Sequence, residues 1–424
     1  MIIDLRDALR LDDQPGLTGD TLVPVWVVPA DWSQWSARRR AFAAAGVADV
    51  RAQLRARGSD LVIRQGDRAA VLNELALALD CGVSVARPAG LDERADDRRI
   101  TRLHYSDART LYAQDDLPFD AVPEPFTAFR KRVEKALQVA PPVPAPDALP
   151  PLPAGIEPGD LPKVDPVESD PRRYRDYQGG EGAAQAVVRE YFASSRAGRY
   201  KKTRNAMHGA EGSTKFSPWL AQGSLSPRRV WQAVTDYESE HGKNDSTYWI
   251  RFELLWREYF QWWTPQQGAA LFGSRQLPKA MPDFERWCAG DTGVPMVDAN
   301  MRELNATGYM SNRGRQNVAS FLAKDLGIDW RLGAAYFETH LIDYDVASNW
   351  GNWAYVAGDG ADPRDDRWFN VLLQGVRYDP KGTYVRHWCD ELTLIDNQQV
   401  HWPWLAGAPQ PMVHPPRWHG VING

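Results

Sequence analysis

The stretch DYDVASNWGNWAY, from Asp343 to Tyr355, combines groups that could hold and tune a charged ligand. Two carboxylates, Asp343 and Asp345, stand two residues apart, and the amide of Asn349 and the indole of Trp353 follow. A buried carboxylate needs a cationic partner, because otherwise burial raises its pKa until the group is neutral. Acids, an amide and indoles in one short stretch therefore indicate a binding site rather than an ordinary core.

A second stretch, from Tyr200 to Val230, could hold an anion. Four basic residues lie within Arg199–Arg204, and the hydroxyl-rich loop STKFS at 213–217 leads into a predicted helix. Backbone N–H groups at a helix start, with Ser and Thr hydroxyls and a lysine, form an anion cradle. The alternative is a capped helix with a solvated basic face, which this stretch alone favours.

Two further stretches place polar groups on helices. In STYWIRFELLWREYFQWW, Glu253 and Trp256 are three residues apart and can face one ligand, with Arg257 beside them. The alternative there is a buried amphipathic helix with an internal ion pair. In GYMSNRGRQNVASF, four polar residues crowd onto the start of an apolar helix, which a purely structural helix rarely needs. They are Asn312, Arg313, Arg315 and Gln316.

Composition bounds the class of protein. The chain has 424 residues, of which 25% are charged and 43% hydrophobic, as in ordinary globular proteins. Its net charge of −5 argues against wholesale coating of nucleic acid but leaves room for a local basic groove. The 18 tryptophans are the compositional outlier. They indicate large cores or a site that stacks on rings or moves electrons.

The cysteines and the first residues of the chain indicate the cellular compartment of the protein. Cys81, Cys288 and Cys389 are far apart and form no CxxC pattern, so no metal site is expected. A reduced, cytoplasmic setting fits this cysteine usage. The opening MIIDLRDALRLDD is charged from Asp4 onward and does not read as a signal peptide. No apolar run is long enough to span a bilayer, so no membrane partner is expected.

The elements that must position these residues form a first part with strands and helices and a second part that is mostly helical. In the first part, predicted strands at 21–29, 61–66 and 83–86 alternate with predicted helices at 37–58 and 67–80. Strands separated by helices imply a parallel, Rossmann-like sheet. No GxGxxG follows the first strand, so this fold alone specifies no dinucleotide site.

The chain divides into four predicted segments. Residues 1–135 form an α/β domain, and residues 136–175 form a connector whose proline density defeats helix and sheet. Residues 176–405 are predicted to form a large all-α domain, which carries the polar stretches described above. Residues 406–424 are predicted to be an irregular tail.

The whole chain resembles the photolyase and cryptochrome family. The stretches STKFSPWLAQGSLSPR, FELLWREYF, VDANMRELNATGYMSNRGRQNVASFLAKDLGIDWR and LIDYDVASNWGNWAY occur in the order of the family signatures. The variants SNRGRQN and DYDVASNWGNWAY resemble its DASH-type branch. The opening DLRDALRLDDQPGL is less similar, since Asp4 and Leu5 stand where the family has Trp and Phe.

The resemblance implies that the all-α domain binds FAD in a bent form. Asp343 would pair with Arg315 beside the flavin ring, Asp345 would accept from the polar edge of the flavin, and Asn349 would face flavin N5. Arg257 would contact the pyrophosphate. The full set of implied cofactor residues is Tyr200, Ser213, Thr214, Lys215, Phe216, Ser217, Arg257, Arg315, Asp343, Tyr344, Asp345 and Asn349.

The resemblance also implies blue-light-driven splitting of cyclobutane pyrimidine dimers, the reaction of a deoxyribodipyrimidine photo-lyase. Gln316 replaces a methionine and Tyr355 a tryptophan of duplex-repairing relatives. Both changes reduce the stacking surface that offsets base extrusion, so single-stranded DNA is the expected partner of a monomeric protein. RNA and duplex DNA stay open as weaker partners. The implied substrate contacts are Arg204, Glu253, Trp256, Asn312, Arg313, Gln316 and Tyr355.

Two further roles follow from the resemblance. Trp353 and Trp330 match the first two tryptophans of the relay that carries electrons to the flavin, but Leu277 occupies the third position. Trp262, Trp263 and Trp287 are open as replacements. Glu93 is the expected ligand of a folate antenna, 5,10-methenyltetrahydrofolate, whose presence is left open.

Two other functions stay open at this point. One is a sensory blue-light photoreceptor, and the other is a DNA-binding regulator with vestigial repair. The short tail after Trp404 weighs against the sensory class, because a long signalling extension is absent from this sequence. The basic cluster FRKRVEK at 129–135 is expected to be a solvated helix face.

Overall fold

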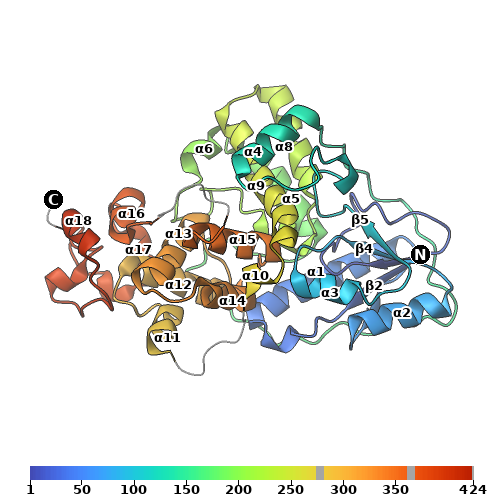
Figure 1. Cartoon of the computed structure of the whole chain (residues 1–424), viewed down its shortest axis with the longest axis horizontal. Coiled ribbons are helices and arrows are strands. Elements are labelled where there is room, and N and C mark those ends of the chain that lie inside the picture. The colour runs from blue at the N-terminus through green and yellow to red at the C-terminus, as the bar shows by residue number, and fades with distance from the viewer. Residues whose placement is uncertain (274–280, 361–367, 423–424) are drawn as a thin grey trace.

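The first domain is built on a parallel sheet, at the right of Figure 1. The computed structural model describes residues 1–273, 281–360 and 368–422. Within these ranges five parallel strands lie in the order β3-β2-β1-β4-β5. They are β1 (Ile2–Asp4), β2 (Val23–Val27), β3 (Val62–Arg64), β4 (Val83–Ala86) and β5 (Leu103–Ser106). The Rossmann-like expectation is confirmed, and β1 and β5 are strands that the sequence pattern did not reveal.

Helices cover both faces of the sheet. Val47 and Val50 of α1 pack with Trp26 on one face, and Leu72 of α2 packs with Val25 on the other. Strands buried on both faces have near-continuous apolar sequences, as β2 does. The helices of this domain are α1 (Ala37–Ala56), α2 (Arg68–Ala78), α3 (Leu91–Asp97) and α4 (Phe126–Ala136).

The proline-rich connector lies against the α/β domain. Residues 137–180 contain neither helix nor strand. The Pro158 carbonyl accepts from the Ile63 amide of β3 over 2.6 Å, and the Leu149 amide donates to the Arg57 carbonyl at 2.8 Å. The connector therefore occupies the Ile63 amide at the outer edge of β3, which would otherwise be open to another strand.

The second domain is helical and surrounds α9, whose start is fixed by a capping box on Asn244. Helix α9 packs on α4, α6, α8 and α15. The helices are α5 (Glu181–Phe192), α6 (Tyr200–Thr203), α7 (Ser217–Gln222), α8 (Pro227–His241), α9 (Asp245–Gln267), α10 (Ala269–Phe272), α11 (Pro282–Ala289), α12 (Pro295–Thr307), α13 (Asn312–Ser320), α14 (Trp330–His340), α15 (Val346–Ala357), α16 (Val371–Tyr378), α17 (Thr383–Trp388) and α18 (His419–Ile422).

The tail that was expected to be irregular contains ordered turns. A 3-10 turn at Pro416–Trp418 leads into α18, at the far end of the molecule from the sheet (Figure 1). Trp418 is 1% exposed. Its ring lies 6.1 Å from that of Trp404 and 6.5 Å from that of Phe321. Burial of this one aromatic ring fixes the end of the described chain on the helical domain.

Buried polar contacts join the two domains. Glu181 at the start of α5 accepts from the amides of Leu11 and Asp12, at 2.8 and 3.1 Å. Arg10, 1% exposed, donates to the Gly223 carbonyl at 2.9 Å. These contacts fix one relative position of the domains, because each would leave an unsatisfied buried group if it were broken. Across the described part of the chain, no helix has the length and apolarity needed to cross a membrane.

Candidate functional site

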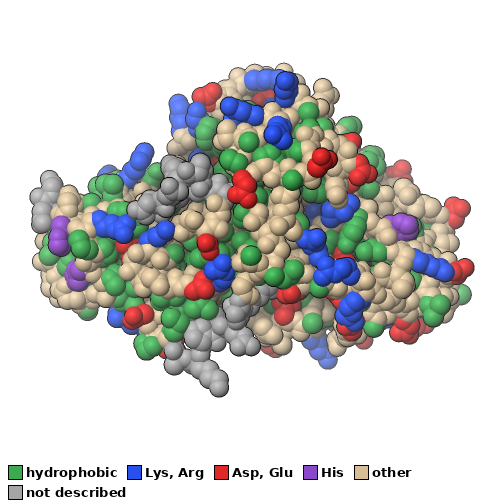
Figure 2. Space-filling view, in the orientation of Figure 1, with side chains coloured by type: hydrophobic (Ala, Val, Ile, Leu, Met, Phe, Trp, Pro, Cys, Tyr) green, Lys and Arg blue, Asp and Glu red, His purple; other side chains and the backbone are tan. Residues whose placement is uncertain are grey.

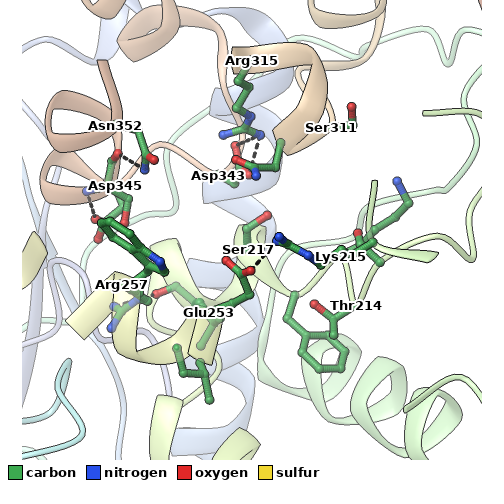
Figure 3. Close-up of a pocket in the computed structure, with 18 of the residues that line it drawn as sticks. Thr214, Lys215, Ser217, Glu253, Arg257, Ser311, Arg315, Asp343, Asp345 and Asn352 are labelled. Carbon is green, nitrogen blue, oxygen red and sulfur yellow. Dashed lines mark hydrogen bonds and ion pairs between the residues drawn. The ribbon is translucent and has the colours of Figure 1, made fainter. Parts of the chain in front are cut away.

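Two adjoining cavities lie among the helices of the second domain. The larger has a volume of about 380 Å³ and the smaller about 180 Å³. Figure 3 shows side chains from α7, α9, α13 and the loops before α7 and α15 pointing toward a common space. Residues shared by both walls include Ser217, Tyr309, Asn312, Arg315, Gln316 and Asp343. A continuous site of this size can hold a large cofactor.

Asp343 and Arg315 form a charged pair in this wall. One guanidinium nitrogen of Arg315 lies 2.9 and 2.7 Å from the two carboxylate oxygens of Asp343. The Nε of Arg315 donates to the Met310 carbonyl at 2.9 Å, which orients the guanidinium plane. Burial opposes the charge of Arg315, but Asp343 outweighs it and the pKa of Arg315 is raised. Arg315 therefore stays charged beside the cavity.

Asp345 has its oxygens occupied by partners from three elements. It caps α15 by accepting from the Ser348 amide at 2.8 Å. Arg109 of the α/β domain donates at 2.6 Å, and Gln261 of α9 donates to both oxygens at 3.0 and 2.9 Å. Burial would raise the pKa of Asp345, but Arg109 and Arg257 outweigh it and the pKa is lowered. Asp345 is thus a fixed negative charge.

Two cations in the wall, the buried Lys215 and the half-buried Arg257, form no direct ion pair with a carboxylate anywhere in the described ranges. Lys215 is 6% exposed, adopts a left-handed φ of 52° and holds its amine 4.8 Å from the centre of the Tyr309 ring. Arg257 donates to the carbonyls of Arg109 and Leu220, at 2.7 and 3.4 Å. Burial lowers the pKa of Arg257. Positive groups that have no direct ion pair fit a ligand that brings negative charge, such as a diphosphate.

The outer part of the larger cavity carries aromatic and acidic side chains. The Trp256 ring stacks on Phe126 with centroids 3.8 Å apart and meets Tyr355 edge-on at 5.4 Å. Glu253 is held by Arg204 in a close ion pair. Burial raises the pKa of Glu253, although Arg204 acts in the opposite direction. This part of the cavity can stack a flat ring and offer it a carboxyl group.

Most of the residues singled out from the sequence line these two cavities. The larger wall contains Tyr200, Arg204, Ser213, Thr214, Lys215, Phe216, Ser217, Glu253, Trp256, Arg257, Asn312, Arg315, Gln316, Asp343, Asp345 and Tyr355. Asn349 and Trp353 line the smaller one. The Oε1 atom of Gln316 is buried without a hydrogen-bond partner in the described structure, so it is available to a ligand donor.

Three of the expected site residues lie elsewhere. Tyr344 faces an interdomain cavity of about 200 Å³, where its hydroxyl lies 3.3 Å from the indole nitrogen of Trp350. Arg313 is outside the described walls of both cavities and bonds to Asn205 at 3.0 Å. Trp330 donates to Asp359 at 3.0 Å and meets the Trp350 ring edge-on at 5.9 Å. Tyr344 therefore shares the interdomain cavity with Asp345 and lies apart from Asp343.

Trp353 lies in the wall of the smaller cavity and contacts a second indole. The rings of Trp353 and Trp287 have centroids 6.1 Å apart and meet edge-on. Trp287 is fully buried and donates to the Val318 carbonyl at 3.1 Å. Leu277 lies outside the described residues. A ring-to-ring contact therefore extends from the cavity wall into the helical core.

Glu93 lies in the interdomain cavity with Tyr344. Burial raises the pKa of Glu93. The guanidinium of Arg39, in the same wall, stacks 3.5 Å from the centre of the Trp35 ring. Asp345 lines this cavity and both of the others. The interdomain cavity thus offers a flat ring, a cation and a carboxyl group next to the larger site.

Sequence reasoning missed two residues that hold the site together. Gln261 lies one turn after Arg257 on α9, so its i+4 spacing was a usable signal. Arg109 lies 236 positions from Asp345 in an irregular segment, and nothing local in the sequence connects the two. In the described ranges, no cluster of three His, Cys, Asp or Glu side chains has a metal-binding arrangement.

Exposed basic side chains gather above the helical domain. Figure 2 shows Lys and Arg on the upper part of this face, in the region of α4, α6 and α8. Lys201 of α6 pairs with Asp245 at 3.0 Å and lies 4.8 Å from the Trp249 ring centre. A local basic surface thus exists on a chain of net negative charge.

Comparison with known proteins gives consistent matches. A family model described as DNA photolyase matches residues 2–147, and one described as the FAD binding domain of DNA photolyase matches residues 249–415. The sequence is 47% identical over 391 residues to the cryptochrome DASH of Gloeobacter violaceus, covering 86% of this chain and 78% of that protein. It is 44% identical over 448 residues to the cryptochrome DASH of Natronomonas pharaonis, covering 96% and 94%. The crystal structure of a Synechocystis sp. PCC6803 cryptochrome superposes with a TM-score of 0.91 at 38% identity, covering 100% and 97%.

Proposed function

The chain belongs to the DASH branch of the photolyase and cryptochrome family, and on this basis we propose that it splits cyclobutane pyrimidine dimers in single-stranded DNA under blue light. The FAD-binding domain identifies its cofactor as FAD. The observation that carries the proposal is the larger cavity, where Lys215 and Arg257, which form no direct ion pair in the described residues, line the same space as Glu253 and Trp256. One end suits a charged cofactor and the other an extruded base.

In this proposal the chain holds FAD by charge and hydrogen bonds. Lys215 and Arg257 contact the diphosphate, and the hydroxyls of Ser213, Thr214 and Ser217 contact the remaining polar groups. The Asp343–Arg315 pair flanks the ring system, and Asn349 approaches it from α15. When bound, FAD supplies the light-absorbing group and the electron that opens the lesion. The protein fixes position and local charge, and excludes water.

The lesion is held by the outer part of the cavity. Trp256 and Tyr355 offer ring faces or edges, and Gln316 offers an unsatisfied carbonyl oxygen. Glu253, held by Arg204, offers its carboxyl group to a polar edge of the base. Tyrosine stacks less surface than tryptophan, while extruding a base from a duplex costs a few kcal/mol. A single strand avoids most of this cost, which is the reason for the proposed preference.

The test measures turnover on matched substrates. Purified protein carrying one FAD is illuminated with a reductant and an oligothymidine dimer substrate, either single-stranded or annealed to its complement. We expect repair of the single strand and much slower repair of the duplex. Equal rates would contradict the strand preference. A well-folded protein that cannot be loaded with FAD would contradict the proposed function as a whole.

The alternative function is a sensory blue-light photoreceptor, or a DNA-binding regulator with vestigial repair. The names of the relatives support this alternative, because those proteins are called cryptochromes. The same experiment separates the two functions. Flavin that is photoreduced normally, with no dimer turnover on either substrate, would support the alternative.

A further inference from the structure

A fourth cavity lies where the proline-rich connector meets both domains. This connector cavity has a volume of about 400 Å³ and is lined by α1, by the connector and by the last turn of α12. Its volume is within the range of small-molecule sites. None of the cofactor, substrate or relay residues named above lines it. The connector cavity is therefore separate from the site proposed for FAD and the lesion.

The charged groups in the wall of the connector cavity are mostly positive. They are the three arginines Arg38, Arg173 and Arg175 and one acid, Asp176. The side chain of Asp176 is 81% exposed, and its carboxylate lies 3.4 Å from the guanidinium of Arg173. An ion pair that is exposed to this degree neutralises little of the local field. The cavity therefore presents a positive surface to a ligand.

Arg38 on α1 is a half-buried cation without a direct partner. It forms no hydrogen bond or ion pair with any other residue that the structure describes. Burial lowers the pKa of Arg38, while Asp170 acts in the opposite direction and Arg173 adds to the lowering. The two carboxylate oxygens of Asp170 are bound by Arg172, at 3.1 and 2.8 Å. Arg38 therefore has donors available to an anion in the cavity.

Arg175 in the connector also has a donor that is not used. Its Nη2 lies 3.1 Å from Glu190, but the same carboxylate pairs with Arg196 at 2.8 Å. The Nε of Arg175 is buried and has no hydrogen-bond partner in the described structure. Buried donors are normally satisfied, so an unsatisfied one fits a ligand that supplies an acceptor.

The remaining wall of the connector cavity is largely apolar. Phe42 and Ala45 of α1, Val167 of the connector and Ile342 before α15 contribute to it, together with the ring of Tyr177. Small-molecule sites combine such apolar surface with a few polar groups that orient the ligand. The cavity thus suits a molecule that has a strongly anionic end and a flat or apolar body.

We propose that the connector cavity binds a phosphate monoester of nucleotide size, with its phosphate held by Arg38 and Arg173. A phosphate monoester has close to two negative charges at pH 7, which suits a wall of three guanidiniums and one carboxylate. Guanidinium groups pair with phosphate oxygens in a bidentate geometry. Because Arg38 belongs to the α/β domain and Arg173 to the connector, the bound ester joins these two segments. This site goes beyond the proposed photochemistry and does not depend on it.

The first test uses adenosine 5′-monophosphate as the probe. Full-length protein carrying FAD is titrated by calorimetry with this nucleotide, with adenosine and with inorganic phosphate. We expect saturable binding of the nucleotide, weaker binding of inorganic phosphate and no binding of adenosine. Arg38→Gln and Arg173→Gln should each weaken nucleotide binding by roughly 10- to 100-fold, because each removes a charged hydrogen bond. Arg98→Gln, at an exposed position outside the cavity wall, is the matched control and should bind like the parent.

Three outcomes of this titration would overturn the proposal. They are absence of saturable nucleotide binding to the parent, parental affinity in both Arg38→Gln and Arg173→Gln, and inorganic phosphate or adenosine binding as tightly as the nucleotide. The FAD content and the unfolding temperature show that each variant is folded. If one variant unfolds, the other decides the result.

The second test separates the connector cavity from a DNA-binding surface. Nucleotide affinity should fall between pH 7.5 and pH 5.5, because the phosphate ester loses its second charge near pH 6 while the arginines keep theirs. An undamaged single-stranded oligothymidine, whose internal phosphates have one charge each, should bind to Arg38→Gln as tightly as to the parent. An equal loss of nucleotide and oligothymidine binding in Arg38→Gln would assign these arginines to a nucleic-acid surface and overturn the proposal. A nucleotide affinity independent of pH would contradict recognition of the dianion.

Discussion

Arg109 of the α/β domain and Asp345 of the helical domain form a buried ion pair, with 2.6 Å between Nη2 and Oδ2. Arg109 is 6% and Asp345 5% exposed. Arg109 also contacts Asp7 at 2.6 Å. Because Asp345 caps α15 and lines both cavities of the candidate site and the interdomain cavity, this pair connects the docking of the domains to the geometry of the candidate site.

Replacing Arg109 by Leu should destabilise the protein by on the order of 3–5 kcal/mol, because Asp345 would be left buried and unpaired. The lowered pKa of Asp345 means that the contribution of this pair is present above the ordinary pKa of an aspartate and is lost as the pH falls below it. Urea unfolding at pH 7 and pH 3 measures both effects. Adding Asp345→Asn should recover part of the loss at pH 7, and additive losses would contradict the coupling.

Replacing Lys215 by Met should weaken FAD binding by roughly 10- to 100-fold, since a charged hydrogen bond contributes about 1.5–3 kcal/mol. Methionine keeps the volume and most of the chain length but removes the charge. Flavin fluorescence during equilibrium titration measures the dissociation constant. Lys202→Met, on an exposed position of α6, is the matched control and should bind FAD like the parent. Equal affinity in both variants would remove Lys215 from the cofactor site.

Gln316→Met combined with Tyr355→Trp should raise repair of duplex DNA relative to single strands. The added stacking surface offsets part of the extrusion cost, and about 1–3 kcal/mol per stacked base corresponds to at least several-fold. The ratio of the two turnover rates is the measurement. Trp256→Phe, which trims a ring that both substrates use, should lower both rates and leave the ratio unchanged. An unchanged ratio in the double variant would mean that strand preference arises elsewhere.

Trp353→Phe and Trp330→Phe should each slow light-driven reduction of the bound flavin, because they remove the two proposed relay indoles. Leu277→Trp should leave the rate equal or faster. Trp287→Phe tests whether the ring contact between Trp287 and Trp353 serves the same relay. Absorbance under constant light with an external electron donor follows the reaction. Parental rates in both Trp353→Phe and Trp330→Phe would show that electrons arrive by another path.

Glu93→Gln should weaken binding of 5,10-methenyltetrahydrofolate if the interdomain cavity is the antenna site. Glu93 lines that cavity, and the substitution removes its negative charge and one of its two acceptor oxygens. The near-ultraviolet absorbance of gently isolated protein incubated with folate measures occupancy. Glu74→Gln, on an exposed position of α2, is the control. An equal folate signal in both variants would exclude Glu93 as the ligand.

The α/β class and the helical second domain were predictable from sequence because their signals are local. Apolar runs alternate with helical patterns up to residue 86, and α1 begins and ends within two residues of its predicted bounds. β1 and β5 were not predicted. β1 has only three residues, and β5 is half-exposed with the pattern of a polar edge strand. β1 is too short, and β5 too exposed, to show the apolar run that predicts a buried strand.

The candidate site was predictable through motifs, but its supporting contacts were not. Signature stretches identified residues such as Lys215, Arg257 and Asp343, whereas Arg109 is brought to Asp345 only by domain docking. Tyr344 differs from its neighbours in the direction of its side chain. It shares a motif with Asp343 and Asp345, yet the turn before α15 directs it into the interdomain cavity. Motif membership predicts proximity along the chain and does not determine the direction of a side chain.

The contact between Pro158 and Ile63 determines where a separately expressed α/β domain should end. A fragment cut after α4 would contain every strand, yet it would expose the edge of β3 and the apolar surface that Leu149 covers. We expect such a fragment to associate with its own copies through this edge. We therefore expect a soluble fragment to extend past Pro158, because the connector, which has no regular elements, covers the outer edge of the sheet.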